Sequence, residues 1–115
     1  MTSTSAKDFF DEWQSNLQSL RDDAPDMARA FGGLHIAAMK EGTLTVREKE
    51  LIALAIGLAK GCTDCIFLHA EGALKAGASR EQVIEATGVA VLMEGGPAFV
   101  HLPVVFDALD HLKAE

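Results

Sequence analysis

Two cysteines, a histidine and a glutamate lie within one short stretch of the chain, and side chains of these types can together carry out redox chemistry. Cys62 and Cys65 are the two cysteines of the protein and form a C-x-x-C pair, with His69 after them and Glu50 before them. The run LIALAIGLA that follows Glu50 carries no charge. Two thiols at this spacing can alternate between a dithiol and a disulfide, and an imidazole and a carboxylate can move protons. A thiol-dependent redox site is therefore predicted.

Cys62, Cys65 and His69 are spaced i, i+3 and i+7, so on one helix they lie on the same face. The two sulfurs are then close enough to form a disulfide. Cys62 comes at the predicted start of the helix, where unpaired N–H groups and the helix dipole favour a thiolate. A thiolate is the form that attacks disulfides and peroxides, so this argument makes Cys62 the stronger thiolate.

Two other interpretations of the cysteine pair stay open. Free cysteines are often buried as small apolar side chains, so the pair could be structural. A zinc site would use Cys62, Cys65 and His69, with Glu50 or His101 as the fourth ligand. Zinc-binding C-x-x-C pairs usually lie in loops, whereas this pair opens a predicted helix. We therefore favour the redox pair and expect neither a metal nor a cofactor.

Glu50 and His101 are the further candidates for the site. A surface position is the default for a glutamate, but the neighbours of Glu50 on the helix surface are small or apolar, namely Val46, Ala53, Leu54 and Gly57. Another helix can pack closely there and bury the carboxylate, which could then shuttle protons. His101 lies on an apolar helix face and is expected beside the site in a supporting role. No role is predicted for His35 or His111.

The elements that must position these residues are helices throughout. Apolar residues recur at three- and four-residue intervals, and no stretch shows a persuasive two-residue alternation. Six helices are predicted, over residues 6–21, 25–40, 46–60, 62 or 63 to 75, 80–94 and 97–112. Thr45 and Ser79 begin capping boxes, and Gly61 and Gly77 offer helix stops. Pro103 is expected to bend the last helix or delay its start, and the predicted fold class is all-α.

Composition excludes several classes of partner. The 115 residues fit one domain, of which 49% are hydrophobic, and 17 acids against 10 bases give a net charge of −7. A chain this acidic, without a basic cluster, is not expected to bind nucleic acid or an anionic membrane. No uncharged run is long enough to span a bilayer. The first residues lack the pattern of a secretory signal, which predicts a cytoplasmic protein.

Two helices have more apolar surface than one short chain can cover. Beyond its first turn the helix 46–60 is apolar nearly all round, and the helix 80–94 is almost as apolar. A helix that is apolar on every side must be buried. Because six helices cannot enclose two such elements, we predict an obligate homo-oligomer.

The combined pattern resembles the carboxymuconolactone decarboxylase family, and within it the alkylhydroperoxidase D-like branch. The resemblance rests on the run from Glu50 through the C-x-x-C pair to His69, on the stretch GASREQVIEA from residue 77, and on Gly95-Gly96-Pro97. It covers about residues 44–112. It implies one helical domain over 1–115, with an N-terminal helical pair (1–43) and a core that bears the motif (44–112), assembled as a trimer or hexamer.

The resemblance also implies an antioxidant peroxidase or disulfide reductase. In that scheme Cys65 attacks the hydroperoxide and becomes a sulfenic acid, while Cys62 protonates the leaving oxygen and then condenses to the disulfide. Glu50 and His69 match the proton relay that activates Cys65, and a thiol or lipoyl-type reductant would restore the dithiol. The family assignment of the nucleophile thus differs from the dipole argument, and we follow the family.

Departures from the family pattern keep alternatives open. Some members carry a histidine before the second cysteine, where this chain has Asp64, whose negative charge opposes thiolate formation. The longer relatives resemble two units in one chain, and this chain has one. A lactone decarboxylase would use Glu50 with His69 or His101 for acid–base chemistry, although the namesake decarboxylases lack the dithiol. A metal-binding or redox-sensing module without turnover is the third alternative.

Overall fold

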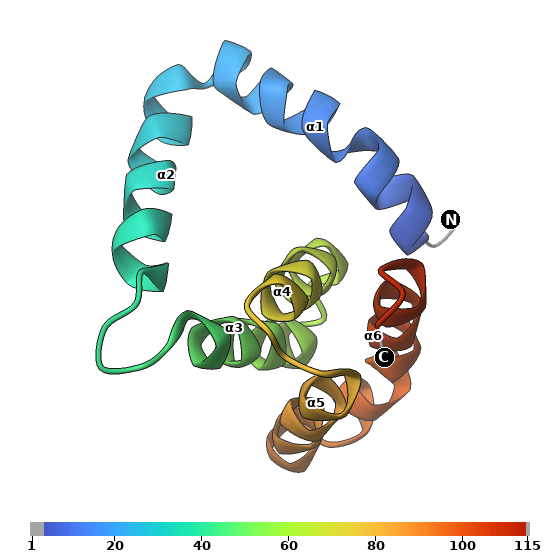
Figure 1. Ribbon diagram of the computed structural model, residues 1–115. Coiled ribbons are helices and arrows are strands. Elements are labelled where there is room, and N and C mark those ends of the chain that lie inside the picture. Colours follow the sequence, from blue (N-terminus) through green and yellow to red (C-terminus); the bar gives the residue numbers. More distant parts are fainter. Residues whose placement is uncertain (1–3, 115) are drawn as a thin grey trace.

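The computed structural model describes residues 4–114, and these fold into six α-helices without a strand (Figure 1). The helices are α1 (Ala6–Asp23), α2 (Pro25–Met39), α3 (Val46–Lys60), α4 (Thr63–Lys75), α5 (Arg80–Glu94) and α6 (Gly96–His111). The all-α prediction is confirmed, and each predicted helix end is correct to within a residue or two. Within these residues no helix is both long and apolar enough to cross a membrane.

The helix ends follow from local hydrogen bonding, as the sequence indicated. At the start of α3 the Glu48 N–H donates to the Thr45 hydroxyl at 3.1 Å, and the Thr45 N–H donates to the Glu48 carboxylate at 2.9 Å. Ser79 and Gln82 form the same capping box before α5. Gly61 ends α3 with φ at 68°, a left-handed conformation that glycine adopts without steric cost.

The last helix corrects one expectation. α6 begins at Gly96 and continues through Pro103, so Pro103 does not delay its start. Pro97 lies in the first turn, where a missing N–H costs nothing because that donor has no partner within the helix. Further along, α6 buries Ala98, Val105 and Leu109 against the core. This packing offsets the backbone hydrogen bond that Pro103 removes.

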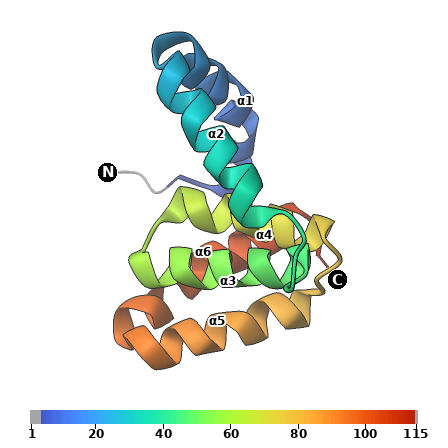
Figure 2. The ribbon, with the colours of Figure 1, turned by 90° about the vertical axis from the view of Figure 1, so that its left-hand side faces the viewer.

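Helices α3 to α6 enclose the hydrophobic core. α3 packs against α4 and α5, and α6 packs against α4 (Figures 1 and 2). α1 joins this core at its N-terminal end, where the Phe9 ring lies 5.3 Å from the Phe67 ring and the Ala6 N–H donates to the Asp107 carboxylate at 2.7 Å. The largest fully buried side chains are Phe67, Leu54, Leu58, Ile66, Leu109, Val83, Val105 and Thr87.

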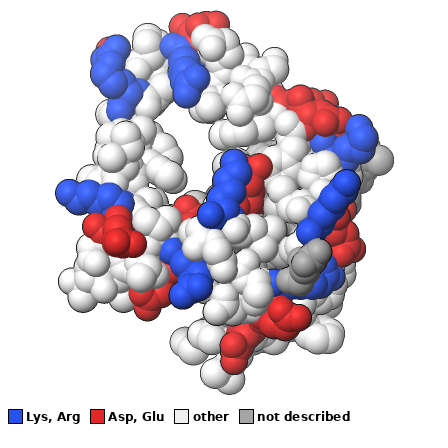
Figure 3. Space-filling view, viewed as in Figure 1, with Lys and Arg blue, Asp and Glu red and all other residues white. Residues whose placement is uncertain are grey.

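Beyond this anchor, α1 and α2 form an arm that arches away from the core (Figures 1 and 2). In the space-filling view an opening separates the arm from the remaining helices (Figure 3). α2 has no buried residue. Phenylalanine side chains usually lie in the core, but Phe31 of α2 is 67% exposed and Phe99 of α6 is 62% exposed. The reason is that α2 and the start of α6 contact too little of their own chain to be covered by it.

We expect Thr45→Ala to destabilise the protein by about 1 kcal/mol, the usual cost of losing an N-cap side chain. The hydrogen bonds from the Thr45 backbone and hydroxyl lower the pKa of Glu48 below its ordinary 4.5. A carboxylate with a lowered pKa stabilises the fold above its unfolded pKa, and this contribution is lost as the pH falls through the folded value. The destabilisation should therefore shrink in acid.

Thermal unfolding of both proteins at neutral and acidic pH, at one protein concentration, measures this difference. Thr43→Ala, in the exposed loop just before the cap, is the control and should leave the melting temperature unchanged. Equal melting temperatures for the wild type and Thr45→Ala at neutral pH would contradict the assigned cap.

Candidate redox site

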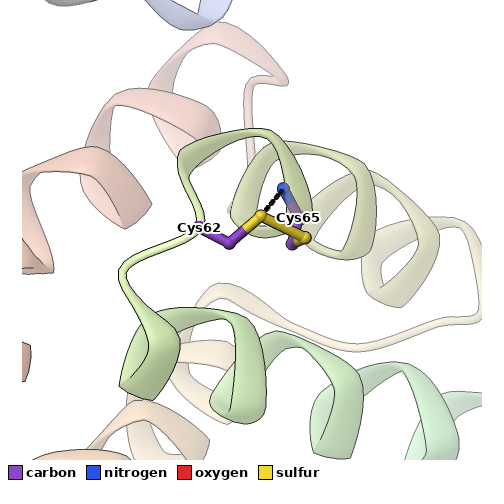
Figure 4. The surroundings of a disulfide bond; sticks show 2 residues. All are labelled: Cys62 and Cys65. Atoms are coloured by element: carbon purple, nitrogen blue, oxygen red, sulfur yellow. Dashed lines mark hydrogen bonds between the residues drawn. A yellow bond between two sulfur atoms is a disulfide. The ribbon is translucent and has the colours of Figure 1, made fainter.

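The two cysteines meet at the start of α4, where Cys62 is the N-cap residue and Cys65 lies in the first turn (Figure 4). Their sulfurs are joined in a disulfide, with the Cα atoms 5.3 Å apart. The Cys65 N–H donates to the Cys62 sulfur at 3.3 Å. The Cys62 sulfur thus takes the place of the oxygen that usually caps a helix, where a backbone N–H stabilises negative charge.

Glu50 and His69 form the second part of the site. The Nδ1 atom of His69 in α4 lies 2.8 Å from a carboxylate oxygen of Glu50 in α3. Only 11% of the Glu50 side chain and 22% of the His69 side chain are exposed, so Glu50 is buried as its small neighbours indicated. Because Glu50 engages Nδ1, the other ring nitrogen of His69, Nε2, is left to exchange protons at the site. His69 lies one helical turn beyond Cys65, on the same face of α4.

Two glycines allow α3 and α4 to come this close. A Cβ atom on Gly57 would lie 3.1 Å from the Cβ atom of Cys65, and one on Gly72 would lie 2.5 Å from the carboxyl carbon of Glu50. Real Cβ atoms hardly ever come within 3 Å of another heavy atom, so a side chain at position 72 would displace the carboxylate. Gly57 was among the small neighbours expected beside Glu50. Gly72 was missed, although it lies three residues after His69 and thus on the same helix face.

The structure does not connect His101 or Asp64 to this site by hydrogen bonds. His101 is half-buried in α6, and its Nε2 atom is fully buried without a hydrogen-bond partner in the described part of the chain. Asp64 is exposed in the first turn of α4, where the helix dipole favours a negative charge. The supporting role expected for His101 and the expected opposition of Asp64 to thiolate formation stay predictions.

The zinc alternative finds no geometric support. Over residues 4–114, no three histidine, cysteine or acidic side chains are grouped so that they could hold a metal ion. The two sulfurs are bonded to each other, so in this form neither is a thiolate that could bind zinc. The arrangement instead pairs a two-electron redox couple with a buried carboxylate and imidazole that can move protons.

His35 is a second residue whose position the sequence did not reveal. Its ring, on α2, lies 6.5 Å from the His69 ring, and the two ring planes differ by 17°. No local pattern marks His35, because it is brought to His69 only by the way the end of α2 packs against α3.

Known proteins resemble this chain in sequence and in fold. The sequence profile of the carboxymuconolactone decarboxylase family matches residues 25–106. The chain is 38% identical over 90 residues to an uncharacterized protein of Cupriavidus necator, across 78% of this chain and 80% of that protein. It is also 31% identical over 70 residues to the alkyl hydroperoxide reductase AhpD of Corynebacterium kroppenstedtii, across 61% of this chain and 40% of that protein.

Solved structures show the same fold. A carboxymuconolactone decarboxylase family protein of Legionella pneumophila superimposes with a TM-score of 0.86 at 33% identity, covering 92% of this chain and 95% of that one. A family member of Thermotoga maritima gives a TM-score of 0.81 at 29% identity, with 90% and 89% covered. The latter is described as a candidate participant in the antioxidative response.

We expect Gly72→Ala to separate Glu50 from His69. The added methyl group overlaps the carboxylate, and overpacking of this kind costs about 1–3 kcal/mol, more than the helix propensity that alanine gains. Gly33→Ala is the matched control, because a Cβ atom there meets nothing within 4 Å and alanine stabilises an exposed helix by up to about 1 kcal/mol. Thermal unfolding of both variants should therefore shift in opposite directions. A Gly72→Ala protein as stable as Gly33→Ala would show that the close approach is not needed.

Proposed function

Since the chain belongs to the carboxymuconolactone decarboxylase family, in its alkylhydroperoxidase D-like branch, we propose that it is an enzyme that reduces hydroperoxides or disulfides. Its redox couple is the Cys62–Cys65 pair. The observation that carries the proposal is the disulfide at the start of α4, one turn from a histidine that is hydrogen-bonded to a buried glutamate. An antioxidant role follows from this chemistry.

The first half of the reaction consumes the hydroperoxide. Cys65 loses its proton to Nε2 of His69, and the Cys65 thiolate bonds to the terminal peroxide oxygen while the O–O bond breaks. The leaving alkoxide takes the proton of the Cys62 thiol and departs as an alcohol. Cys65 is now a sulfenic acid and Cys62 a thiolate. Glu50 stabilises the charged imidazole, because its carboxylate accepts the hydrogen bond from Nδ1.

The second half forms the disulfide. The Cys62 thiolate attacks the Cys65 sulfur, the S–O bond breaks, and the departing hydroxide takes the proton held on His69 to become water. The dithiol has then lost two electrons, and the peroxide has gained them. The Cys65 N–H that donates to the Cys62 sulfur supports this division of roles, because it stabilises the thiolate that Cys62 becomes once it has protonated the leaving alkoxide. A thiol or lipoyl-type dithiol restores the pair.

The wild-type protein, once reduced, should lose two hydrogen atoms (about 2 Da) when it reacts with an organic hydroperoxide, and intact mass measures this loss. Cys65→Ser should abolish turnover, because the residue that accepts the peroxide oxygen is absent. In Cys62→Ser the reaction should stop at a sulfenic acid on Cys65, so the mass of the protein should rise by one oxygen atom (about 16 Da).

The two cysteine variants also distinguish the alternatives. Full turnover in Cys65→Ser would show that Cys62 is the nucleophile or that the dithiol is not used. Lactone decarboxylation that survives replacement of both cysteines would assign the protein to acid–base chemistry through Glu50 and His69 instead.

We further propose that the protein works as a homo-oligomer of three or six copies. Large apolar side chains remain exposed on α2 and around the α5–α6 turn, namely Met27, Phe31, Leu34, Ile36, Val89, Leu92, Met93, Phe99 and Val100. On α3, the helix expected to be buried all round, Ile52 and Ile56 are about half exposed. Exposed apolar surface of this extent marks an interaction site. Since α2 and the α5–α6 turn are different surfaces, their pairing between copies is a head-to-tail contact, which forms a closed ring when the rotation from copy to copy closes.

The molar mass in solution should thus be three or six times 12.3 kDa by light scattering after size exclusion. Leu92→Glu places a charge on a side chain that is 80% exposed in the single chain, and we expect it to shift the protein towards monomers. Gln14→Glu adds the same charge on the exposed side of α1 and should leave the molar mass unchanged. A monomeric wild type would contradict the proposed assembly.

A further inference from the structure

His35 takes no part in the hydroperoxide reduction proposed above, yet its imidazole ring lies beside that of His69. The ring centroids are 6.5 Å apart and the planes differ by 17°, within the range of about 4.5–7 Å over which aromatic rings pair. We propose that His35 is a positioning residue that acts through His69, passing protons between the solvent and the Glu50–His69 pair. The inference rests on the proposed function only in requiring that the cysteine pair is reduced and oxidised.

The C-terminal end of α2 is fixed beside this pair. The Lys49 ammonium group donates to the carbonyl oxygen of Ala38 at 2.9 Å and to that of Lys40 at 2.6 Å. These are carbonyls at a helix end, which lack partners within the helix and attract a cation. Ala38 lies one turn after His35, and Lys49 directly precedes Glu50 in α3. The same short segment of α3 therefore holds both His35 and the carboxylate in place.

Burial makes a surface partner for His69 useful. Glu50 and His69 have largely buried side chains, whereas His35 is exposed in the single chain. The inference therefore requires that the neighbouring copies in the proposed assembly leave the His35 side of α2 open to solvent. Nδ1 of His69 is hydrogen-bonded to Glu50. Protons can therefore exchange directly between His69 and the bulk solvent only at Nε2. Imidazole gains and loses protons readily near neutral pH, and polar groups more than 3.5 Å apart can be linked through a solvent molecule. His35 is thus suited to transfer protons from the solvent to His69.

The step that draws protons from outside is reduction of the disulfide. A dithiol reductant attacks one sulfur of the Cys62–Cys65 pair, the S–S bond breaks, and the other sulfur departs as a thiolate. The reductant closes to its own disulfide, giving up two electrons and releasing two protons, and the cysteines take up two protons. The released protons enter the solvent, so those taken up at the partly buried sulfurs must come from it. His35 and His69 together provide that route.

The test is the rate at which dithiothreitol reduces the oxidised full-length protein at pH 7, followed by acid quenching and intact mass. We expect His35→Ala to slow reduction about tenfold, less than the 10²–10⁴-fold of a direct general acid. Added imidazole should restore the rate of His35→Ala and leave the wild type unchanged. His111→Ala is the matched control and should be reduced at the wild-type rate. His111 also stacks on a ring, that of Phe10 at 5.4 Å, but it lies at the C-terminal end of α6.

A second variant separates proton transfer from mere packing. Lys49→Met retains His35 but releases the end of α2, so it should show the same slow reduction and the same response to imidazole. Wild-type rates in His35→Ala, or a slow rate that imidazole does not restore, would overturn the inference. This measurement uses no hydroperoxide. If the reduced wild-type protein does not react with hydroperoxides, the proposed peroxidase activity is refuted, but the test of His35 stays valid.

Discussion

The close packing of α3 against α4 is the constraint on which the site depends. Glu50 and His69 lie 19 residues apart in the chain, and their hydrogen bond exists only because two helices approach without intervening side chains. Gly57 provides the space beside the dithiol and Gly72 the space beside the carboxylate. A carboxylate in this position is costly to bury alone. Its hydrogen bond with the imidazole offsets that cost and at the same time fixes the orientation of the ring.

In our proposal the same arrangement explains how the two cysteines divide the chemistry. Cys62 occupies the N-cap position, where its sulfur accepts the Cys65 N–H, and Cys65 lies one turn before His69. In our proposal one sulfur is stabilised as a thiolate by the helix start, and the other gives its proton to the imidazole on the same helix face. The dipole argument and the family resemblance, which name different cysteines, describe the two halves of one asymmetric pair. In our proposal both are used, at successive steps.

The arm formed by α1 and α2 has few contacts of its own, and its stability depends on what covers it. α1 is anchored at one end by Phe9 and by the hydrogen bond to Asp107, while α2 is held by the ammonium group of Lys49. Between these points the apolar residues of α2 face the solvent in a single chain. An arm of this kind suits the assembly that we propose, and it also brings His35 beside His69.

Features that depend on neighbouring residues could be predicted from the sequence. The capping boxes at Thr45 and Ser79, the stop at Gly61 and the common helix face of Cys65 and His69 follow from backbone hydrogen bonds and from the helical repeat, which span only a few residues. Glu50 could be predicted to be buried because its small neighbours lie on its own helix. The overall all-α fold follows from the same local signals.

Only the tertiary structure showed how the helices meet. That Glu50 pairs with His69 rather than with His101, that Gly72 must lack a side chain, and that Phe31 is exposed all depend on packing between segments far apart in the chain. His35 shows this most clearly, since its own helix contains no sign of a partner in α4. The physical reason is that local patterns specify which face of a helix is apolar. Which other helix covers that face depends on how all the helices pack together.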